Sequence, residues 1–434
     1  MSTLAVGIIG LAICFVLMFL RMPIGFAFGI VGFLGIWYVK GSGAALSAVG
    51  TIPYATLVKY VWSVMPLFIL MGYLALQTKL AEEFYDGVRR WIGQFRGGLA
   101  SAVILGNTAF GACSGDLISA SITFTTISLP QMRKYKYADT LTLGSVAAGS
   151  FLALLIPPSL GFIIYGAITE TSIGELFMAG IFPGLLLAGL YLATIYILCR
   201  RNPALGPAGP KTTFREKMGA GTGMWALIVV FAVIIGGLYF GLFTPTEAGA
   251  FGAFTVVVIG LARRKLSWQG FKTAMVDTGL TTGLVFFLLI GVTVFNLFLV
   301  TTGVPFAIAN FVSGVTQSPV GTLLIIVAIY FALGMVMDAM ALILLTVPIF
   351  FPVLMGMGVS PITFGVVAVM TMAIGAITPP YGIVVYAMKG VVKDVPLFTI
   401  FRGAAPFIVA MLICEFAVVF FPQIALFLPH TMFQ

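Results

Sequence analysis

Charged residues are scarce in this 434-residue sequence. Asp, Glu, Lys and Arg together make up 8% of it, whereas hydrophobic residues make up 61%. Soluble domains carry about 25% charged residues. A globule of this size in water could not cover that much apolar surface, so we expect lipid to be its solvent. The composition therefore excludes a cytosolic enzyme.

Histidine and paired cysteines are also missing. The single histidine, His430, stands near the C-terminus, which excludes histidine-based catalysis and histidine metal sites. The four cysteines lie in apolar segments without CxxC spacing, so the sequence encodes neither a disulfide framework nor a zinc site. Without a phosphate loop, an HExxH or a GxSxG motif, a primary pump and an intramembrane enzyme are both disfavoured.

Apolar runs long enough to cross a bilayer, about 20 residues each, recur along the chain. The predicted spans are 3–20, 22–39, 51–78, a broken helix across 138–168, 173–199, 223–242, 246–262, 273–301, a broken helix across 361–388, and 396–421. The first run lacks a basic start and a cleavage site, so we interpret it as a span and not as a signal peptide. Two other runs, 98–131 and 319–353, contain an aspartate in a polar turn, and each is predicted to be a hairpin that enters the membrane and returns.

Basic residues predict the orientation of these segments. The net charge of +9 comes from short loops between apolar runs, so it indicates membrane topology and no nucleic-acid partner. The basic clusters lie at 89–96, 133–136, 200–217 and 263–272, and the positive-inside rule places all four in the cytoplasm. The count of spans between them is consistent only if the first hairpin is re-entrant. Both termini are then expected outside, and the two hairpins enter from opposite faces.

Two segments outside the spans have a clear pattern. Residues 81–95 place apolar side chains on one helical face opposite charged ones, which is typical of an amphipathic helix at the membrane interface, most simply a structural brace. Residues 200–222 are rich in proline and glycine and are predicted to be a cytoplasmic linker between two halves.

An internal repeat gives the strongest signal. Asp116 and Asp338, Pro130 and Pro352, and the dipeptides Pro157-Pro158 and Pro379-Pro380 are each separated by 222 residues. Since the two hairpins enter from opposite faces, the repeats must be inverted. Inverted repeats with discontinuous helices are the architecture of secondary transporters. The predicted fold class is an all-α integral membrane protein with inverted repeats, two oppositely oriented re-entrant hairpins and two broken helices.

The helix breaks predict a cation site. Each diproline removes backbone donors and ends a helix, and the freed carbonyls need a partner inside the membrane. A hard cation such as Na⁺ would satisfy them together with the hydroxyls of Ser114, Ser150 and Thr378, although one diproline alone could be a simple kink. Asp116 and Asp338 could cap half-helices, ligate the cation, or do both.

Basic residues are missing where an anionic cargo would bind. The sequence has no Lys or Arg between Arg96 and Arg133, between Lys136 and Arg200, or between Lys272 and Lys389. The charge of such a cargo would have to be met by half-helix N-termini and by the bound cations.

Several motifs together resemble a known family, the large membrane subunit of tripartite ATP-independent periplasmic (TRAP) transporters. They are Arg21-Met-Pro-Ile-Gly-Phe-Ala27, Met65-Pro-Leu-Phe-Ile-Leu-Met-Gly72, Phe110-Gly-Ala-Cys-Ser-Gly115, Ile156-Pro-Pro-Ser159, Ser172 to Gly184, Phe243-Thr-Pro-Thr-Glu-Ala-Gly249, Gly334 to Asp338, and Gly375-Ala-Ile-Thr-Pro-Pro-Tyr-Gly382. The resemblance implies a sodium-driven elevator importer in a bacterial inner membrane. It also implies a periplasmic substrate-binding protein that delivers a small organic anion, carboxylate or sulfonate, and a small four-helix membrane subunit.

The same resemblance implies the site residues. Na⁺, with two sites and no organic cofactor, would be held by Ser114, Gly115, Asp116, Gly149, Ser150, Pro157, Met337, Asp338, Gly375, Thr378 and Pro379. The substrate would contact Ser114, Ser119, Pro158, Ser159, Ala339, Pro380 and Tyr381. The sequence departs from the family's common pattern at Asp116, Ala120, Ala153-Leu154 and Thr371.

The chain divides into four predicted parts: scaffold helices and the amphipathic helix (1–97), a first transport repeat (98–199), a linker with scaffold spans (200–318) and a second transport repeat (319–434). A stand-alone sodium/carboxylate symporter, which needs no binding protein, is the main alternative. A channel or structural membrane subunit is a further alternative. Transport that does not depend on sodium would favour it.

Overall fold

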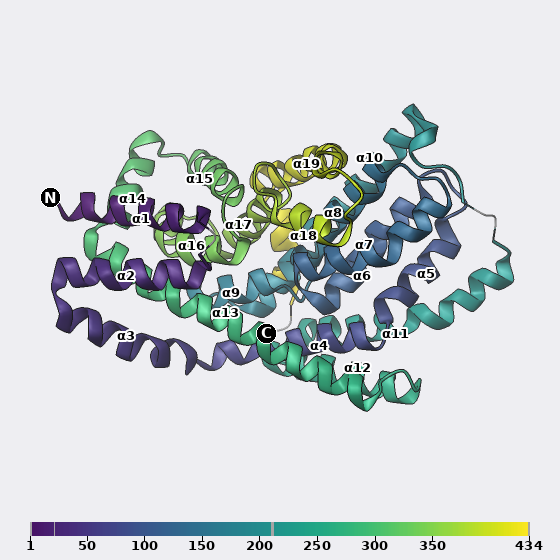
Figure 1. Cartoon of the computed structure of the whole chain (residues 1–434), viewed down its shortest axis with the longest axis horizontal. Coiled ribbons are helices and arrows are strands. Elements are labelled where there is room, and N and C mark those ends of the chain that lie inside the picture. The colour runs from purple at the N-terminus through teal and green to yellow at the C-terminus, as the bar shows by residue number, and fades with distance from the viewer. Residues whose placement is uncertain (1, 21, 210–211, 433–434) are drawn as a thin grey trace.

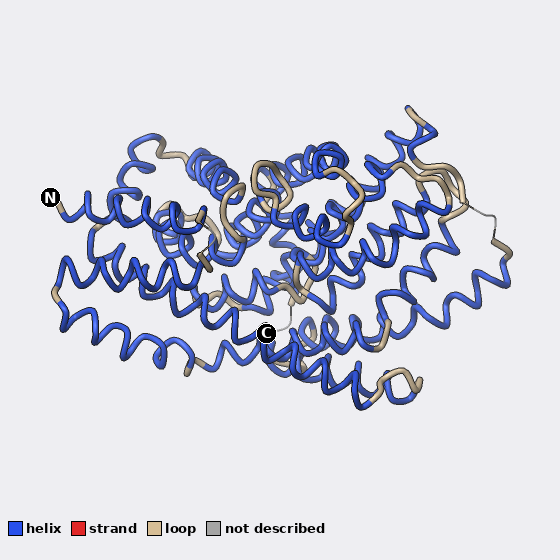
Figure 2. Tube along the Cα trace, viewed as in Figure 1, coloured by secondary structure: helices blue, strands red, loops and turns tan. Residues whose placement is uncertain are grey.

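The computed structural model describes residues 2–20, 22–209 and 212–432, without the side chains of 112, 220–222 and 313. Within these residues the chain is helical and contains no strand (Figures 1 and 2). The helices are α1 Thr3–Phe19, α2 Ile24–Lys40, α3 Ser42–Leu57, η1 Tyr60–Ser63, α4 Val64–Gln77, α5 Leu80–Ile92, α6 Gly98–Ser114, α7 Leu117–Lys134, α8 Asp139–Leu155, α9 Leu160–Thr169, α10 Ile173–Arg201, η2 Pro203–Leu205, α11 Phe214–Tyr239, α12 Pro245–Ala262, α13 Trp268–Thr302, α14 Val304–Val315, α15 Pro319–Gly334, α16 Ala339–Gly356, α17 Pro361–Gly375, α18 Ile383–Val391, α19 Leu397–Phe420 and α20 Gln423–Thr431. Among the described residues, 7 helical segments are long and apolar enough to cross a membrane.

The hairpins and broken helices are present where the sequence predicts them. Helices α6 and α7 form one helix–turn–helix and α15 and α16 the other, each with its aspartate just before the second helix. The diprolines interrupt the chain between α8 and α9 and between α17 and α18, and both Pro-Pro peptide bonds are cis. The amphipathic segment is α5, which packs against α6 and α11. Entry of each hairpin from one membrane face stays a prediction.

The repeat extends further than the sequence indicates. Helices α5 to α10 are matched in order by α14 to α19, and α2 and α4 by α12 and the second part of α13. In this scaffold part the separation is 224 residues: the hydroxyl of Thr78 donates to the carbonyls of Leu74 and Ala75, and that of Thr302 donates to those of Phe298 and Leu299. The repeat therefore includes the scaffold.

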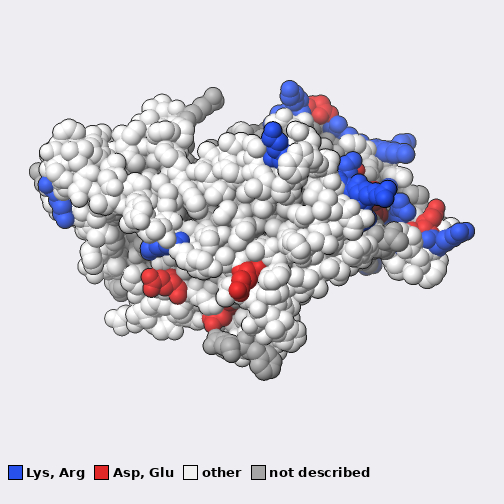
Figure 3. Space-filling view, turned by 90° about the horizontal axis from the view of Figure 1, so that it is seen from below, with Lys and Arg blue, Asp and Glu red and all other residues white. Residues whose placement is uncertain are grey.

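Packing between the halves is exchanged, as an inverted repeat requires. Helix α2 packs along α13, with Gly25 against Leu288, and α12 packs along α4, with Gly249 against Leu67. In Figure 1, α1 to α3 lie toward one end of the molecule and α11 and α12 toward the other. On the face in Figure 3, Lys and Arg gather mainly at the end where α10 and α11 are linked, which agrees with the predicted cytoplasmic clusters.

The predicted single span 51–78 is wrong. The chain there forms α3, η1 and α4, and Lys59 has extended backbone between α3 and η1. Pro66 stands in the first turn of α4, where its missing N–H costs nothing. A helix that continued from α3 through Pro66 would lose a hydrogen bond and clash with the carbonyl one turn earlier, so the break lies upstream of it.

The predicted linker 200–222 is too long. Helix α10 continues to Arg201, and α11 already begins at Phe214. A capping box starts α11, because the Thr213 backbone N–H donates to Glu216 Oε2 at 2.7 Å while the Thr213 hydroxyl accepts from the Glu216 N–H at 3.4 Å. The remaining linker contains η2, and Pro210 and Lys211 lie outside the described residues, as does Arg21 of the first motif.

Close backbone contacts hold each hairpin to its broken helix and one repeat to the other. A Cβ atom on Gly111 would overlap the backbone of Ala153, and one on Gly334 would meet the Cα of Gly375 at 3.3 Å. These two contacts occupy similar places in the two repeats. Helices α8 and α19 cross at Gly144 and Gly403, where backbone meets backbone.

We predict that Gly403→Leu separates α8 from α19 and destabilises the fold, because the side chain would collide with the backbone of Thr140 and Gly144. Overpacking costs about 1–3 kcal/mol and more against a rigid backbone. The matched control is Gly189→Leu, since a Cβ there meets nothing within 4 Å. Thermal unfolding of the purified protein should show a lower midpoint for the first variant only; equal midpoints would contradict the assignment.

Candidate transport site

Each hairpin tip is hydrogen-bonded to the helix break of its own repeat. The Leu160 N–H donates to the Gly115 carbonyl at 3.3 Å, and the Tyr381 N–H donates to the Met335 carbonyl at 3.2 Å. Gly115 has a φ of 59°, and a Cβ there would lie 2.8 Å from the Pro158 carbonyl oxygen. The tip can therefore approach the first break this closely only with glycine at 115.

Both hairpin aspartates cap helices. Asp116 Oδ2 accepts a hydrogen bond from the Ser119 N–H at 2.7 Å at the start of α7. Asp338 Oδ1 accepts from the N–H groups of Met340 at 3.0 Å and Ala341 at 3.3 Å at the start of α16. The predicted capping role is confirmed, and ligation of a cation by either carboxylate stays a prediction.

Buried oxygens without partners lie beside the first tip. Among the described residues, neither Ser114 Oγ nor Asn107 Oδ1 has a hydrogen-bond partner. The Asn107 amide nitrogen donates to the Val103 carbonyl at 3.1 Å, and a Cβ on Gly149 would lie 2.8 Å from that nitrogen. Asn107 therefore stands between α6 and α8 beside the predicted sodium segment. Sequence reasoning missed it, although a lone amide in an apolar run is a signal of function.

The donor set fits a hard cation. The hydroxyls of Ser150 and Thr378 donate to the carbonyls of Ala147 at 2.8 Å and Ile374 at 2.6 Å, which leaves their lone pairs directed elsewhere. No group of three or more His, Cys, Asp or Glu side chains that could hold a metal occurs in the described part of the chain. Oxygen atoms of this kind favour an alkali or alkaline-earth ion over a transition metal.

A cavity of about 100 Å³ lies between the tips and the scaffold, and we name it the tip cavity. Its lining comes from both hairpins, α9 and two scaffold helices: Ile69, Gly72, Tyr73, Leu76, Ser114, Asp116, Ser119, Leu160, Thr281 and Met340. Three predicted site residues, Ser114, Asp116 and Ser119, therefore meet at one cavity, and no Lys or Arg is among its described lining residues.

The other predicted residues lie around this cavity and not on it. Gly149, Ser150, Pro157, Pro158 and Ser159 are buried behind the first tip, and Met337, Ala339 and Gly375 are buried at the second. Ser159 caps α9 by accepting from the Phe162 N–H at 3.3 Å. Pro379, Pro380 and Tyr381 are exposed, and Thr378 is partly buried. The first helix break is thus buried, and the second is exposed.

Scaffold residues on the tip cavity were not foreseen from the sequence. The Tyr73 hydroxyl and Thr281 Oγ1 are hydrogen-bonded at 2.7 Å. Gly72 packs against the first tip, where a Cβ would lie 2.9 Å from the Cys113 carbonyl oxygen. Extension of the repeat into the scaffold was the signal that could have directed attention to these helices.

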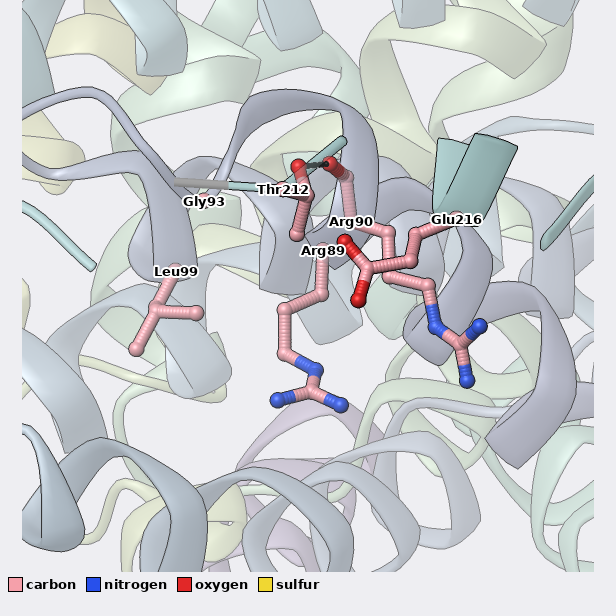
Figure 4. A pocket seen from close by; sticks show the side chains of 6 residues that line it. All are labelled: Arg89, Arg90, Gly93, Leu99, Thr212 and Glu216. Atoms are coloured by element: carbon pink, nitrogen blue, oxygen red, sulfur yellow. Dashed lines mark hydrogen bonds between the residues drawn. The ribbon is translucent and has the colours of Figure 1, made fainter. Parts of the chain in front are cut away.

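A second site of charged groups lies apart from the tips, between α5 and the linker. Figure 4 shows Arg89, Arg90, Thr212 and Glu216 around a cavity of about 240 Å³. The Thr212 hydroxyl donates to the Arg90 carbonyl at 2.6 Å, and Arg89 pairs with Asp86 at 3.1 Å. Hydrogen bonds from the Thr213 backbone and hydroxyl hold the pKa of Glu216 below its ordinary value. The contacts of this cluster anchor the linker to α5.

Paired discontinuous helices that meet at a small central cavity define a secondary membrane transporter. The family described as the tripartite ATP-independent periplasmic transporter, DctM component, matches residues 11–424. The chain therefore belongs to the TRAP large permeases: it is a multi-pass transport protein of an inner membrane and not an enzyme.

Three curated relatives support this assignment. The sialic acid TRAP transporter large permease SiaM of Vibrio cholerae is 31% identical and covers 95% of this chain and 96% of its own. The ectoine/5-hydroxyectoine permease UehC of Ruegeria pomeroyi is 35% identical (85% and 86%), and the C4-dicarboxylate permease DctM of Pseudomonas aeruginosa is 33% identical (86% and 86%).

Two solved structures share the fold. The YdaH transporter of Alcanivorax borkumensis matches with a TM-score of 0.61 at 15% identity, over 86% of this chain and 88% of its own. The MtrF efflux pump of Neisseria gonorrhoeae matches with 0.57 at 16%, over 88% and 85%. At these identities the likeness shows the fold alone.

Removal of the second cap gives a test of the aspartates. We predict that Asp338→Ala lowers stability by about 1 kcal/mol, because two N–H groups of α16 lose their acceptor, and that Asp338→Ser restores most of it. Thermal unfolding and sodium titration of both variants check this. A large loss of sodium affinity in both would show that the carboxylate is a ligand.

Proposed function

We propose that this permease imports a small organic anion together with Na⁺. A periplasmic substrate-binding protein would deliver the anion, and a small four-helix membrane subunit would pair with the permease. The named substrates of the relatives, sialic acid, ectoines and C4-dicarboxylates, support a small polar cargo with a carboxylate. The observation that carries the proposal is the pair of buried, unpartnered oxygens of Ser114, on the tip cavity, and of Asn107, whose side chain lies against Gly149.

Sodium would stabilise this arrangement because these oxygens are withdrawn from water. A buried acceptor without a partner costs about 1–3 kcal/mol, and a cation bound there removes that cost. One site would use Ser114, Asn107 and the 149–150 segment, and the other Thr378 with the backbone around 337–338 and 375. Both termini would lie outside, as the basic loops predict.

Coupling follows from the lack of bases. The tip cavity has no basic residue among its described lining residues. Two residues that do line it, Asp116 and Met340, stand just before α7 and in the first turn of α16. Helix N-termini attract an anion, but the capping carboxylates oppose it. Bound Na⁺ would reverse the sign of the local field, so the anion would bind well only after the cation.

Movement would take each hairpin and its broken helix as one unit along the scaffold. The tight contacts at Gly111 and at Gly334 support such a unit, and the scaffold touches it through small contacts, such as Gly72 against Cys113. This is an elevator motion, in which both tips carry the cargo across together.

Sodium dependence is the first test of this function. In proteoliposomes that contain the permease and the small subunit, we predict uptake only with binding protein outside and an inward Na⁺ gradient. Uptake without binding protein would favour the stand-alone symporter. Flux that is unchanged when the Na⁺ gradient is collapsed would contradict symport and favour a channel.

Thr378→Ala removes one proposed sodium oxygen. We predict at least a tenfold rise in the Na⁺ concentration for half-maximal uptake, since a ligand to a charged ion contributes about 1.5 kcal/mol or more. The matched control is Thr255→Ala on α12, because the Thr255 hydroxyl bonds to the Phe251 carbonyl at 2.7 Å in the same local geometry. Equal sodium dependence of the two variants would exclude Thr378 as a ligand.

A further inference from the structure

Another cavity, of about 410 Å³, lies between the scaffold and the transport elements, and we name it the lysine cavity. Its scaffold side comes from α3, η1 and α13, and its other side from α9 and α16. The polar members of its lining are Thr56, Lys59, Trp62, Thr293 and Asn296. Lys59 is the charged residue among its described lining residues, whereas the tip cavity has only Asp116.

The lysine cavity has unused hydrogen-bonding capacity. Trp62 is 4% exposed, and its indole N–H has no partner among the described residues. Lys59 is exposed, and no ion pair to its ammonium group is present in the described structure. An ammonium group and an N–H donor beside two threonines form a site that suits an anionic group.

The repeat relates the two cavities. Thr293 and Asn296 on α13 follow Ile69 and Gly72 on α4 by the scaffold separation of 224 residues, and both pairs line the respective cavities. Thr281, which faces the tip cavity from the first part of α13, corresponds by the same separation to Leu57, the last residue of α3. Lys59 stands two residues after this counterpart, in the break that precedes η1, and it lines the lysine cavity.

The transport elements occupy only one of the two related places. In this structure the tips face α4, whereas the lysine cavity faces the middle of α16 and the end of α9. Asn296 Nδ2 donates to the Leu344 carbonyl of α16 at 2.9 Å. Its counterpart Gly72, in contrast, packs against the tip of the first hairpin. Exchange of the two repeats describes a second state, in which the tips lie against α13 and the end of α3.

We propose that Lys59 binds the anionic cargo in that second state, from the scaffold wall of the lysine cavity. This inference rests on the proposed anion-import function. The end of α4 next to the tip cavity leads to the basic α5 region, so the present state faces the predicted cytoplasmic side, and the second state faces outside. The anion then meets a lysine on arrival and a threonine on release, which weakens its binding as it crosses.

A crosslinking experiment tests the second state without any transport. The pair Tyr73→Cys with Ser119→Cys reports the present state, since both positions line the tip cavity. The second state is reported by Lys59→Cys with Ala341→Cys, because Ala341 follows Ser119 by the 222-residue separation of the transport repeats and Lys59 lines the lysine cavity. All four native cysteines are buried, so they can stay in place, and variants with only one introduced cysteine serve as controls. After treatment with a short bifunctional thiol reagent, mass spectrometry should detect a crosslink for each of the two cysteine pairs. The two crosslinks should occur in different molecules, because they report different states. Linking of the first pair alone would overturn the exchanged state.

Uptake measurements test the lysine itself. We expect Lys59→Gln to raise the KM for binding-protein-delivered anion about 10-fold, the lower range for loss of a hydrogen bond to a charged group, and Lys59→Arg to restore most of it.

The matched control is Lys40→Gln, which removes an exposed lysine at the end of α2, away from the residues that line the lysine cavity. Equal KM changes in Lys40→Gln and Lys59→Gln would mean that the effect comes from the overall positive charge of the surface and not from Lys59 itself. That result would overturn the proposal. So would an unchanged KM in Lys59→Gln. Absence of sodium-driven uptake by the unmodified protein would instead contradict the proposed function, whereas the crosslinks would still decide whether the second state exists.

Discussion

The whole structure depends on how backbone polar groups are satisfied in the middle of an apolar molecule. Eight helices end or begin there: α6, α7, α8 and α9, with their counterparts α15 to α18 (Figure 1). In lipid no water would reach these groups, so each needs an internal partner. The tip-to-break hydrogen bonds and the two aspartate caps supply several, and the oxygens of Ser114 and Asn107 are left without a partner among the described residues, which is why we propose a cation there.

The scaffold has the opposite character, since most of its helices are continuous and it meets the tips through small or neutral side chains. Its two related faces differ in polarity, with Ile69, Gly72 and Thr281 on the tip cavity and Thr293, Asn296 and Lys59 on the lysine cavity. A repeat-built transporter needs two states of similar energy, which pseudo-symmetry provides, and a chemical difference between them, which these side chains would provide. In the mechanism that we propose, the tips remain free of bases, and Lys59 on the scaffold distinguishes the outward state from the inward one.

The sequence predicts the parts that depend on local chemistry. Asp116, Asp338 and the diprolines mark the hairpin turns and helix breaks, because capping and the lack of an N–H act within one turn of helix. Parts that depend on tertiary packing were not predictable. The α3–α4 break lies upstream of Pro66, and the scaffold repeat is hidden because Lys79 and Gly303, both left-handed, share a backbone shape and not a side chain. Burial of Ser159 and exposure of Tyr381 depend on how the two repeats pack against the rest of the fold, which local sequence does not encode.

The distance between the transport elements and the scaffold tests the central claim most directly. Spin labels on Lys134→Cys, at the exposed end of α7, and on Trp268→Cys, at the exposed start of α13, would report it in lipid nanodiscs. Pulsed dipolar spectroscopy should show two distances whose populations change when Na⁺ replaces K⁺ and change again with the anion. One distance, the same in all three conditions, would contradict a sodium-dependent movement of the hairpins along the scaffold.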